Sequence, residues 1–243
     1  MTLPIVDPFN PPYEVWQKRN PTLEEMNANG NWLPVKDQLL GTVFSALGAA
    51  NYTATNAGEI TLKNRLDGHI TDFLKNSADY KAWQNAMPSK TPNAIAEYQK
   101  NSAKSDPVKV NGEIAQYGKL LGVGQCLFHG GLWWGGPGSA TTQTPLSTSL
   151  SPIAAIQNAL HGGKAYNDGR LDLIVLKTTT SKTNAFVFKS SGTNLGHELE
   201  VLLAAGTPLT FVSEACLCSA FEVEKVNDPI KTIPIYVVQV AVG

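Results

Sequence analysis

The sequence of 243 residues predicts an α+β fold in which a helical N-terminal part is followed by a β-rich C-terminal part. Two patterns support this prediction. Apolar residues recur mainly at helical spacing over residues 36–120, whereas short runs of β-branched and aromatic residues follow one another from Gly122 onward. The sequence contains no internal repeat. A chain of this length forms one large domain or two small ones.

Residues 1–35 are expected to form an extended, proline-rich arm. They hold six of the 15 prolines when Pro34 is included. Proline fixes the φ angle and lacks a backbone donor, so this composition favours extended segments and short turns. We expect the arm to drape over the body of the protein through Trp16 and Trp32.

Residues 36–90 are expected to form a helical accessory region. Apolar residues between Leu39 and Leu47, and again over residues 58–74, recur at helical spacing. Thr91-Pro92 then marks a helix start, because an N-cap residue followed by proline is a common helix opening. A further short helix is expected over residues 111–121.

The remainder of the chain is expected to be mainly strands. A helix is expected among them at residues 153–161. Ser151-Pro152, like Thr91-Pro92, places an N-cap residue before a proline at the first helical position. The expected strands are residues 125–129, 142–147, 171–177, 185–189, 198–203, 209–213, 220–226 and 233–242.

Composition excludes several classes of protein. A net charge of −1, from 19 basic and 20 acidic residues, argues against a protein that binds the phosphate backbone of a nucleic acid. No apolar run approaches the roughly 20 residues of a membrane span, and no secretory signal is visible. The three cysteines lack the spacing of a disulfide framework or a zinc site, so we expect no metal and a cytosolic place of action.

Two motifs in the β-rich part place polar groups at the ends of expected strands. In the first, an apolar strand ends in His129 and Gly130, where glycine permits a close backbone approach to a flat ligand. In the second, the hydroxyl residues Ser147, Thr148 and Ser149 precede the expected helix. Each motif has an ordinary alternative when taken alone, namely a core histidine at a turn and hydroxyls that cap a helix.

A third motif places two glutamates, Glu198 and Glu200, one residue apart on an expected strand. Alternation along a strand puts both carboxylates on one face, where they repel and raise one pKa. Two solvated strand glutamates are the alternative. The closeness of the two charges indicates a functional reason for the pair.

Together and in this order, the three motifs resemble those of the mono-ADP-ribosyltransferase family. The spacings match as well, with 18 residues from His129 to Ser147 and 53 from Ser147 to Glu200. The resemblance covers residues 90–243 and implies that they form a catalytic domain with a core of two sheets. Family members with the Ser-Thr-Ser motif usually carry arginine at the position of His129. This chain has no arginine between Arg65 and Arg170.

The resemblance implies an NAD-dependent protein ADP-ribosyltransferase that releases nicotinamide and modifies a host protein on arginine. Glu200 would bind the 2′-hydroxyl of the nicotinamide ribose and stabilise the developing oxocarbenium charge. Ser147 would orient Glu200, and Glu198 would act as the general base on the acceptor.

The same resemblance places other residues around NAD and the acceptor. His129 and Gly130 would bind NAD, with Ser147, Thr148 and Ser149 beside them. Phe188, within an acceptor turn over residues 188–196, and Glu198, which follows that turn, would recognise the acceptor.

Two other functions remain open from the sequence. The acceptor could be water or a nucleic-acid base, which would make the protein an NAD glycohydrolase or a nucleic-acid ADP-ribosyltransferase. The missing arginine could instead mark a catalytically inactive binding module. The expected setting is the cytosol of a host cell, entered by a bacterial effector or phage protein without a classical signal peptide, and otherwise the cytoplasm. A monomer is expected.

Overall fold

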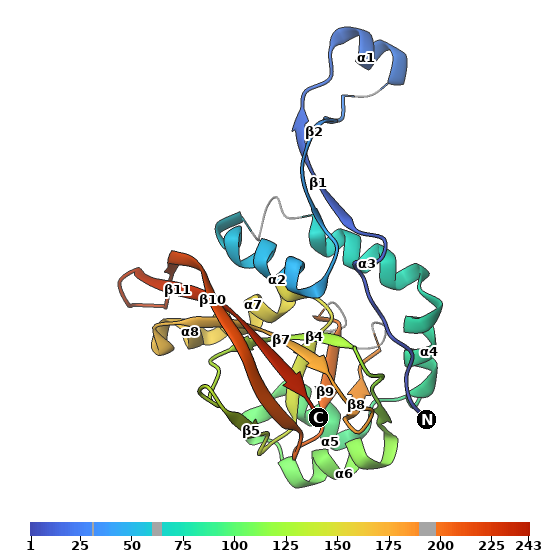
Figure 1. Ribbon diagram of the computed structural model, residues 1–243, viewed down its shortest axis with the longest axis vertical. Helices are drawn as coiled ribbons and strands as arrows, with labels where there is room; N and C mark the ends of the chain where they lie inside the picture. Colours follow the sequence, from blue (N-terminus) through green and yellow to red (C-terminus); the bar gives the residue numbers. More distant parts are fainter. Residues whose placement is uncertain (31, 60–64, 190–197) are drawn as a thin grey trace.

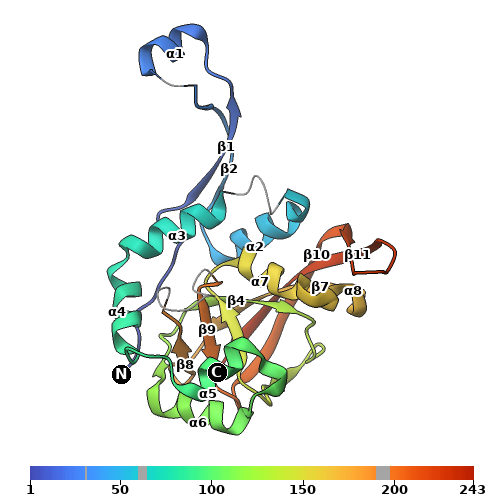
Figure 2. The same ribbon diagram turned by 180° about the vertical axis from the view of Figure 1, so that it is seen from behind.

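The computed structural model describes residues 1–30, 32–59, 65–189 and 198–243. A body of mixed helices and strands is built on a large sheet, and a two-stranded hairpin projects from it (Figure 1). Helices α5 and α6 lie at the end of the body opposite the hairpin, as the view from behind also shows (Figure 2). The α+β class is confirmed at this level.

The described helices and strands have the following bounds. The helices are α1 (Leu23–Asn29), α2 (Ala46–Thr55), α3 (Leu66–Asn76), α4 (Ala78–Ala86), α5 (Asn93–Lys100), α6 (Pro107–Tyr117), α7 (Pro152–Leu160) and α8 (Lys164–Asp168), with short 3-10 turns η1 (Ala57–Glu59), η2 (Ser102–Lys104) and η3 (His161–Gly163). The strands are β1 (Tyr13–Arg19), β2 (Val35–Val43), β3 (Lys119–Leu120), β4 (Cys126–Gly131), β5 (Ser139–Thr141), β6 (Leu146–Ser149), β7 (Leu171–Thr178), β8 (Asn184–Val187), β9 (Glu200–Leu203), β10 (Pro208–Val223) and β11 (Lys231–Val242).

Within the described residues, the large sheet has nine strands in the order β3-β8-β9-β6-β4-β7-β11-β10-β5. Strands β7 and β11 are parallel, and the other neighbours are antiparallel. Strands β4 and β6 are paired only through Phe128 and Ser149. The sheet therefore consists of two halves that meet at one residue pair, which is consistent with the expected two-sheet core.

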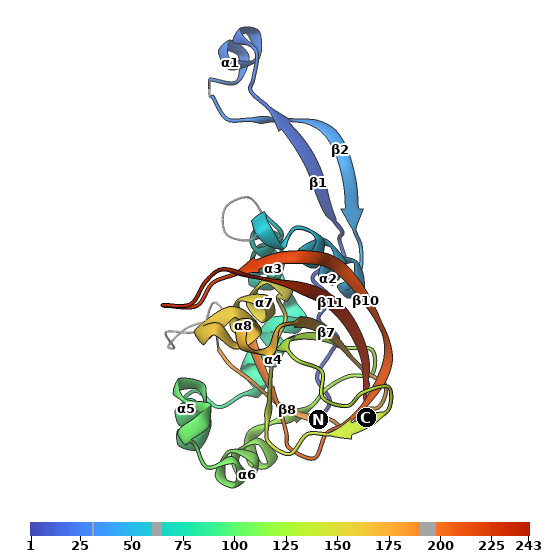
Figure 3. The same ribbon diagram turned by 90° about the vertical axis from the view of Figure 1, so that its left-hand side faces the viewer.

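Strand β2 replaces the helix expected around Leu39 and Leu40. It pairs with β1 along its length, so both leucines lie on the exposed hairpin, 45% and 59% exposed. Gly41 and Val43 favour a helix poorly, and the helical spacing yields to the pairing with β1. Helix α2 begins only after Ser45, whose side chain accepts a hydrogen bond from the Gly48 N–H. The hairpin stands clear of the body (Figure 3).

The N-terminal residues bind the body ahead of the hairpin, and not through Trp16 and Trp32 as expected. Leu3 and Val6 belong to the buried core. The buried side chain of Gln125 accepts from the Val6 N–H at 2.9 Å and donates to the Val6 carbonyl at 3.0 Å. Trp32 is 78% exposed on the hairpin. Burial of Leu3 and Val6, together with the hydrogen bonds between Val6 and Gln125, thus replaces the expected tryptophan packing.

The later elements follow the sequence more closely. Helix α7 opens as expected, with proline in its first turn and the Ser151 hydroxyl accepting from the Ala154 N–H. Helix α6 begins before the expected residue 111, because Asp106 caps it. The two strands expected over residues 209–213 and 220–226 are one long strand, β10, because β11 pairs with it across both segments.

Candidate active site

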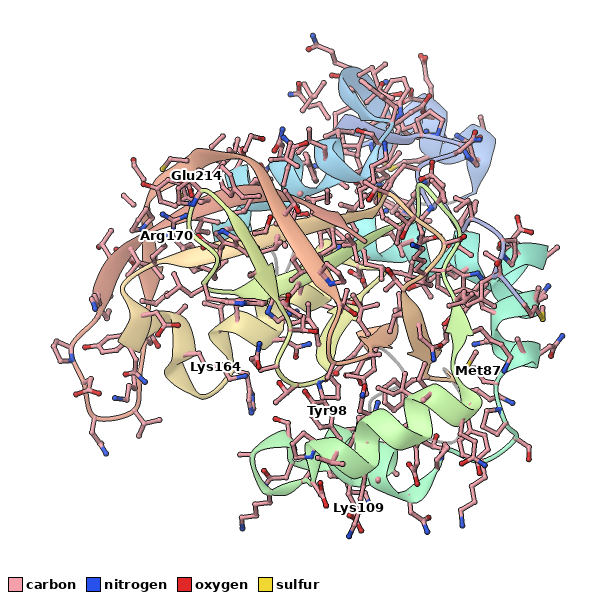
Figure 4. The ribbon with its side chains drawn as sticks, turned by 60° about the horizontal axis from the view of Figure 1, so that its bottom comes forward. Met87, Tyr98, Lys109, Lys164, Arg170 and Glu214 are labelled. Atoms are coloured by element: carbon pink, nitrogen blue, oxygen red, sulfur yellow. The ribbon has the colours of Figure 1, made fainter. Side chains whose placement is uncertain are left out.

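A cavity of about 490 Å³ lies where the two halves of the sheet meet. Strands β4 and β6, helices α5 and α7 and the start of β9 contribute to its wall. Figure 4 labels two of its residues, Tyr98 on α5 and Lys164 on α8, which approach it from different helices. Its lining residues are Tyr98, Gln99, Lys100, Asn101, Ser102, Ala103, Phe128, His129, Gly130, Ser147, Thr148, Ser149, Ala155, Asn158, His161, Lys164, Glu198 and Glu200.

Glu200 is the most enclosed carboxylate of this cavity, with 6% of its surface exposed. The Ser147 hydroxyl donates to its Oε1 at 2.5 Å, and the Gln99 amide donates to its Oε2 at 2.9 Å. Burial raises the pKa of Glu200 and the nearby charge of Glu198 adds to the rise, whereas the two hydrogen bonds oppose it. Glu200 is thus a buried carboxylate with a donor on each oxygen.

The Ser147 contact follows from the register of two neighbouring strands. Strands β6 and β9 are antiparallel, with Ser147 opposite Leu202 and Ser149 opposite Glu200. Ser147 and Glu200 are therefore diagonal neighbours on one face of the sheet, close enough for their side chains to meet.

The other two hydroxyls of the second motif hold the backbone of the third. Thr148 Oγ1 donates to the Val201 carbonyl at 2.5 Å, and Ser149 Oγ donates to the Glu198 carbonyl at 2.6 Å. Both residues line the cavity, but each is only 3% exposed. Their hydroxyls are therefore engaged on the glutamate segment and do not point freely toward a ligand.

Glu198 and Glu200 reach the same cavity by a backbone kink and not by strand alternation. Strand β9 begins at Glu200, and Leu199 before it has a left-handed φ of 51°. This conformation costs a non-glycine residue roughly 1–2 kcal/mol. The Leu150 N–H, which donates to the Leu199 carbonyl at 3.2 Å, holds the kink in place. The expectation of one continuous strand face was wrong, although the two carboxylates do share the cavity.

The ring of His129 has one nitrogen that hydrogen-bonds to the protein. Its Nδ1 lies 2.7 Å from the Ser147 carbonyl oxygen, which can only accept, so Nδ1 carries the hydrogen. Burial lowers the pKa of His129, which favours the neutral ring. In that tautomer Nε2 is an acceptor suited to a ligand hydroxyl.

Gly130 lines the cavity, but helix α7 explains why the residue is glycine. A Cβ atom there would lie 1.8 Å from the Ala155 carbonyl oxygen and 3.1 Å from the Ala159 Cβ. From the sequence, we predicted that a ligand approaches the backbone closely at this glycine. The close approach is instead that of a helix backbone to strand β4.

Several lining residues were missed from the sequence. The segment from Tyr98 to Ala103 closes one side of the cavity, and Lys100 and Lys164 are the lysines that line it within the described part of the chain. Tyr98 lies in the helix whose start Thr91-Pro92 predicted, but nothing in the sequence indicated that the next residues face Glu200. Arg170 is not a lining residue, because it is paired with Asp172 at 2.5 Å.

Phe188 lies in the core and not at the acceptor side of the cavity. Its ring is 2% exposed and meets Phe186 edge-on, with 5.3 Å between the ring centroids. The acceptor contact expected of its aromatic face is therefore wrong. The rest of the expected acceptor turn, from residue 190 to residue 196, lies outside the described residues.

The described residues offer neither a metal site nor a membrane span. No group of three or more His, Cys, Asp or Glu side chains among them is arranged to hold a metal ion. No described helix is both long enough and apolar enough to cross a membrane.

Comparisons with known proteins found similar folds and no similar sequence. No protein-family model and no curated protein matches the chain. The ADP-ribosyltransferase toxin Plx2a from Paenibacillus larvae is 13% identical, with a TM-score of 0.43 over 73% of this chain and 96% of that one. The ADP-ribosylating toxin BECa of C. perfringens, solved with NADH, is 13% identical, with a TM-score of 0.42 over 74% of this chain and 49% of that one. Vis from Vibrio splendidus, also an ADP-ribosyltransferase, is 10% identical, with a TM-score of 0.34 over 93% of this chain and 88% of that one. These solved structures are toxins of the family that the three sequence motifs resemble.

Proposed function

We propose that the protein is an NAD-dependent mono-ADP-ribosyltransferase that modifies an arginine of a target protein. The observation that carries this proposal is the buried Glu200, held on both oxygens in a cavity that also contains Glu198 and the neutral ring of His129. A fixed carboxylate in a poorly hydrated cavity stabilises a developing positive charge far better than one in water.

The reaction follows from the places of the two carboxylates. Glu200 accepts a hydrogen bond from the 2′-hydroxyl of the nicotinamide ribose and faces the oxocarbenium charge that develops as nicotinamide leaves with the electrons of the glycosidic bond. A guanidinium nitrogen of the acceptor then attacks the ribose carbon. Glu198 takes the proton of that nitrogen, which arginine alone releases very reluctantly.

The remaining lining residues suit the other parts of NAD. Lys100 and Lys164 supply the positive charge that a diphosphate requires, as point charges without the paired donors of arginine. Nε2 of His129 accepts from a ribose hydroxyl, and the Gly130 backbone lies next to it for the nicotinamide amide. In this proposal the catalytic part is residues 90–243, and the target is a protein of a host cell that the chain enters.

Two substitutions of His129 separate its roles. His129→Asn retains a donor near Nδ1 for the Ser147 carbonyl but removes the Nε2 acceptor, whereas His129→Leu removes both. We expect His129→Asn to keep the wild-type melting temperature and to raise KM for NAD by roughly ten-fold, since one neutral hydrogen bond is lost. His129→Leu should also lower the melting temperature. A wild-type KM in the asparagine variant would contradict the NAD contact.

The acceptor is tested by comparing Glu198→Gln with the wild type. Both proteins are incubated with NAD and agmatine, a small guanidine, and two products are measured, free nicotinamide and ADP-ribosyl-agmatine. We expect the wild type to form both. The variant should lose roughly a hundred-fold in transfer to agmatine, because a general base is removed, while it still hydrolyses NAD.

The other outcomes assign the alternatives. Nicotinamide release by the wild type without any labelled protein or agmatine would indicate an NAD glycohydrolase. Labelled DNA or RNA would indicate a nucleic-acid modifier. A wild type that binds NAD but releases no nicotinamide would reject the enzyme in favour of a binding module.

A further inference from the structure

The two oxygens of Glu200 receive their donors from different parts of the fold. Ser147, on Oε1, comes from strand β6 beside β9, within the motif that the sequence already indicated. Gln99, on Oε2, comes from helix α5, which precedes the whole large sheet in the chain. The function proposed above gives Gln99 no role.

The orientation of the Gln99 amide is determined by its partner. An ionised carboxylate can only accept, so the amide nitrogen and not the amide oxygen must face Oε2. Hydrogen bonds to an ionised group are about twice as strong as neutral ones, and a carboxylate that is 6% exposed has little water to replace a lost donor.

Helix α5 is fixed at two residues that precede Gln99. The Tyr98 hydroxyl donates to the Pro145 carbonyl at 2.7 Å, just before strand β6. Near the start of the helix, the Ile95 N–H donates to the Glu113 carboxylate on α6 at 2.9 Å. The Gln99 backbone is thus held against the same strand that carries Ser147, so its side chain meets Glu200 from a constrained position.

We propose that Gln99 is a positioning residue for Glu200, which fixes the second carboxylate oxygen so that the plane of the group is set before NAD binds. This inference rests on the proposed function. It adds a third member, from a separate helix, to the Ser147–Glu200 pair. Each carboxylate oxygen retains a lone pair, so the ribose hydroxyl can still donate to the group.

The charges around Glu200 set the direction of the expected pH effect. Glu198 and the buried environment raise its pKa, and the Ser147 and Gln99 hydrogen bonds lower it. Among the described residues, the other ionisable groups that line the same cavity are Tyr98, Lys100, His129, His161 and Lys164. A substitution at Gln99 replaces none of these groups, and it removes a hydrogen bond that lowers the pKa of Glu200, so we expect that pKa to rise.

The first test is the pH dependence of nicotinamide release by Gln99→Met, which is similar in size but has no donor. We expect kcat to fall by roughly ten-fold and the acidic limb of the profile to move up by about one pH unit, with a smaller change in KM. Glu97→Gln, on the exposed side of the same helix, is the matched control and should keep the wild-type profile. An acidic limb unchanged in Gln99→Met would overturn the proposal.

A second measurement does not depend on turnover. The titration of the Glu200 carboxyl carbon is followed by NMR, with the signal assigned by its absence in Glu200→Gln. The titration midpoint of Glu200 should lie higher in Gln99→Met than in the wild type. It should lie higher still in Gln99→Glu, which places a second acid against Glu200. Gln99→Glu also provides the test if Gln99→Met does not fold. Equal midpoints would reject the pairing. A wild type without nicotinamide release, but with shifted midpoints in the variants, would reject the proposed function and retain the pairing.

Discussion

Replacement of Glu200 by glutamine is expected to lower nicotinamide release by roughly a thousand-fold at saturating NAD. The amide has almost the same shape: its oxygen can still accept from Ser147, and its NH2 can donate to Gln99 once the Gln99 amide turns its oxygen toward it, but the group carries no charge to stabilise the oxocarbenium. Initial rates of nicotinamide release measure the effect, and Glu97→Gln is the control glutamate because it is exposed. A Glu200→Gln protein with more than a tenth of wild-type kcat would contradict the role given to this carboxylate.

The same substitution should stabilise the fold at neutral pH. Burial raises the pKa of Glu200 in the folded protein, so the folded state binds a proton more readily than the unfolded state does. Wild-type stability therefore decreases as pH rises from the pKa of an unfolded glutamate through the higher pKa of the folded one. Glutamine does not titrate, so its gain in melting temperature should be present at neutral pH and absent in acid.

Thermal melts at both pH values check this expectation alongside the kinetics. A melting temperature that falls at neutral pH together with activity would show that the glutamine disturbs the fold. In that case the loss of turnover could not be attributed to the missing charge.

Gly130→Ala is expected to destabilise the protein by about 3 kcal/mol or more. The new Cβ would lie 1.8 Å from the Ala155 carbonyl oxygen and 2.6 Å from the Ala155 carbonyl carbon. Both atoms belong to the backbone of helix α7, so no rotation of a side chain relieves the contact and the helix must move away from strand β4.

Urea unfolding measures this effect, with Gly112→Ala as the matched control. Gly112 lies within helix α6, and a Cβ atom added there would meet no described residue outside that helix within 4 Å. Alanine there should stabilise the protein by up to about 1 kcal/mol, because alanine favours a helix more than glycine does. If the Gly130→Ala midpoint matched the wild type, the close contact between α7 and β4 would be refuted.

The sequence predicted local elements better than it predicted neighbours in space. The opening of α7 depends on Ser151 and Pro152 alone, so it could be predicted from residues a few positions apart. The helix expected near Leu39 failed because pairing with β1, a long-range contact, decided the conformation of β2. Spacing along the chain could not reveal that pairing.

In the candidate site, too, residues on neighbouring strands were predicted, whereas contacts from distant parts of the chain were not. The resemblance identified Ser147 and Glu200, which meet because β6 and β9 are neighbours. It could not show the left-handed backbone at Leu199, which depends on hydrogen bonds from the segment after β6. Gln99 reaches the site from a helix about a hundred residues earlier in the chain, and its own sequence context is that of an ordinary surface helix.

The single residue pair between β4 and β6 has a mechanical consequence. The other neighbouring strands of the large sheet are joined by two or more residue pairs, whereas β4 and β6 are joined by one, Phe128 with Ser149, reinforced by the hydrogen bond from His129 to the Ser147 carbonyl. The cavity lies along this junction and is lined by β4 on one side and by β6 on the other. A ligand that contacts both β4 and β6 is therefore expected to bridge the two halves of the sheet and to restrain their relative movement at the position where only one residue pair joins them.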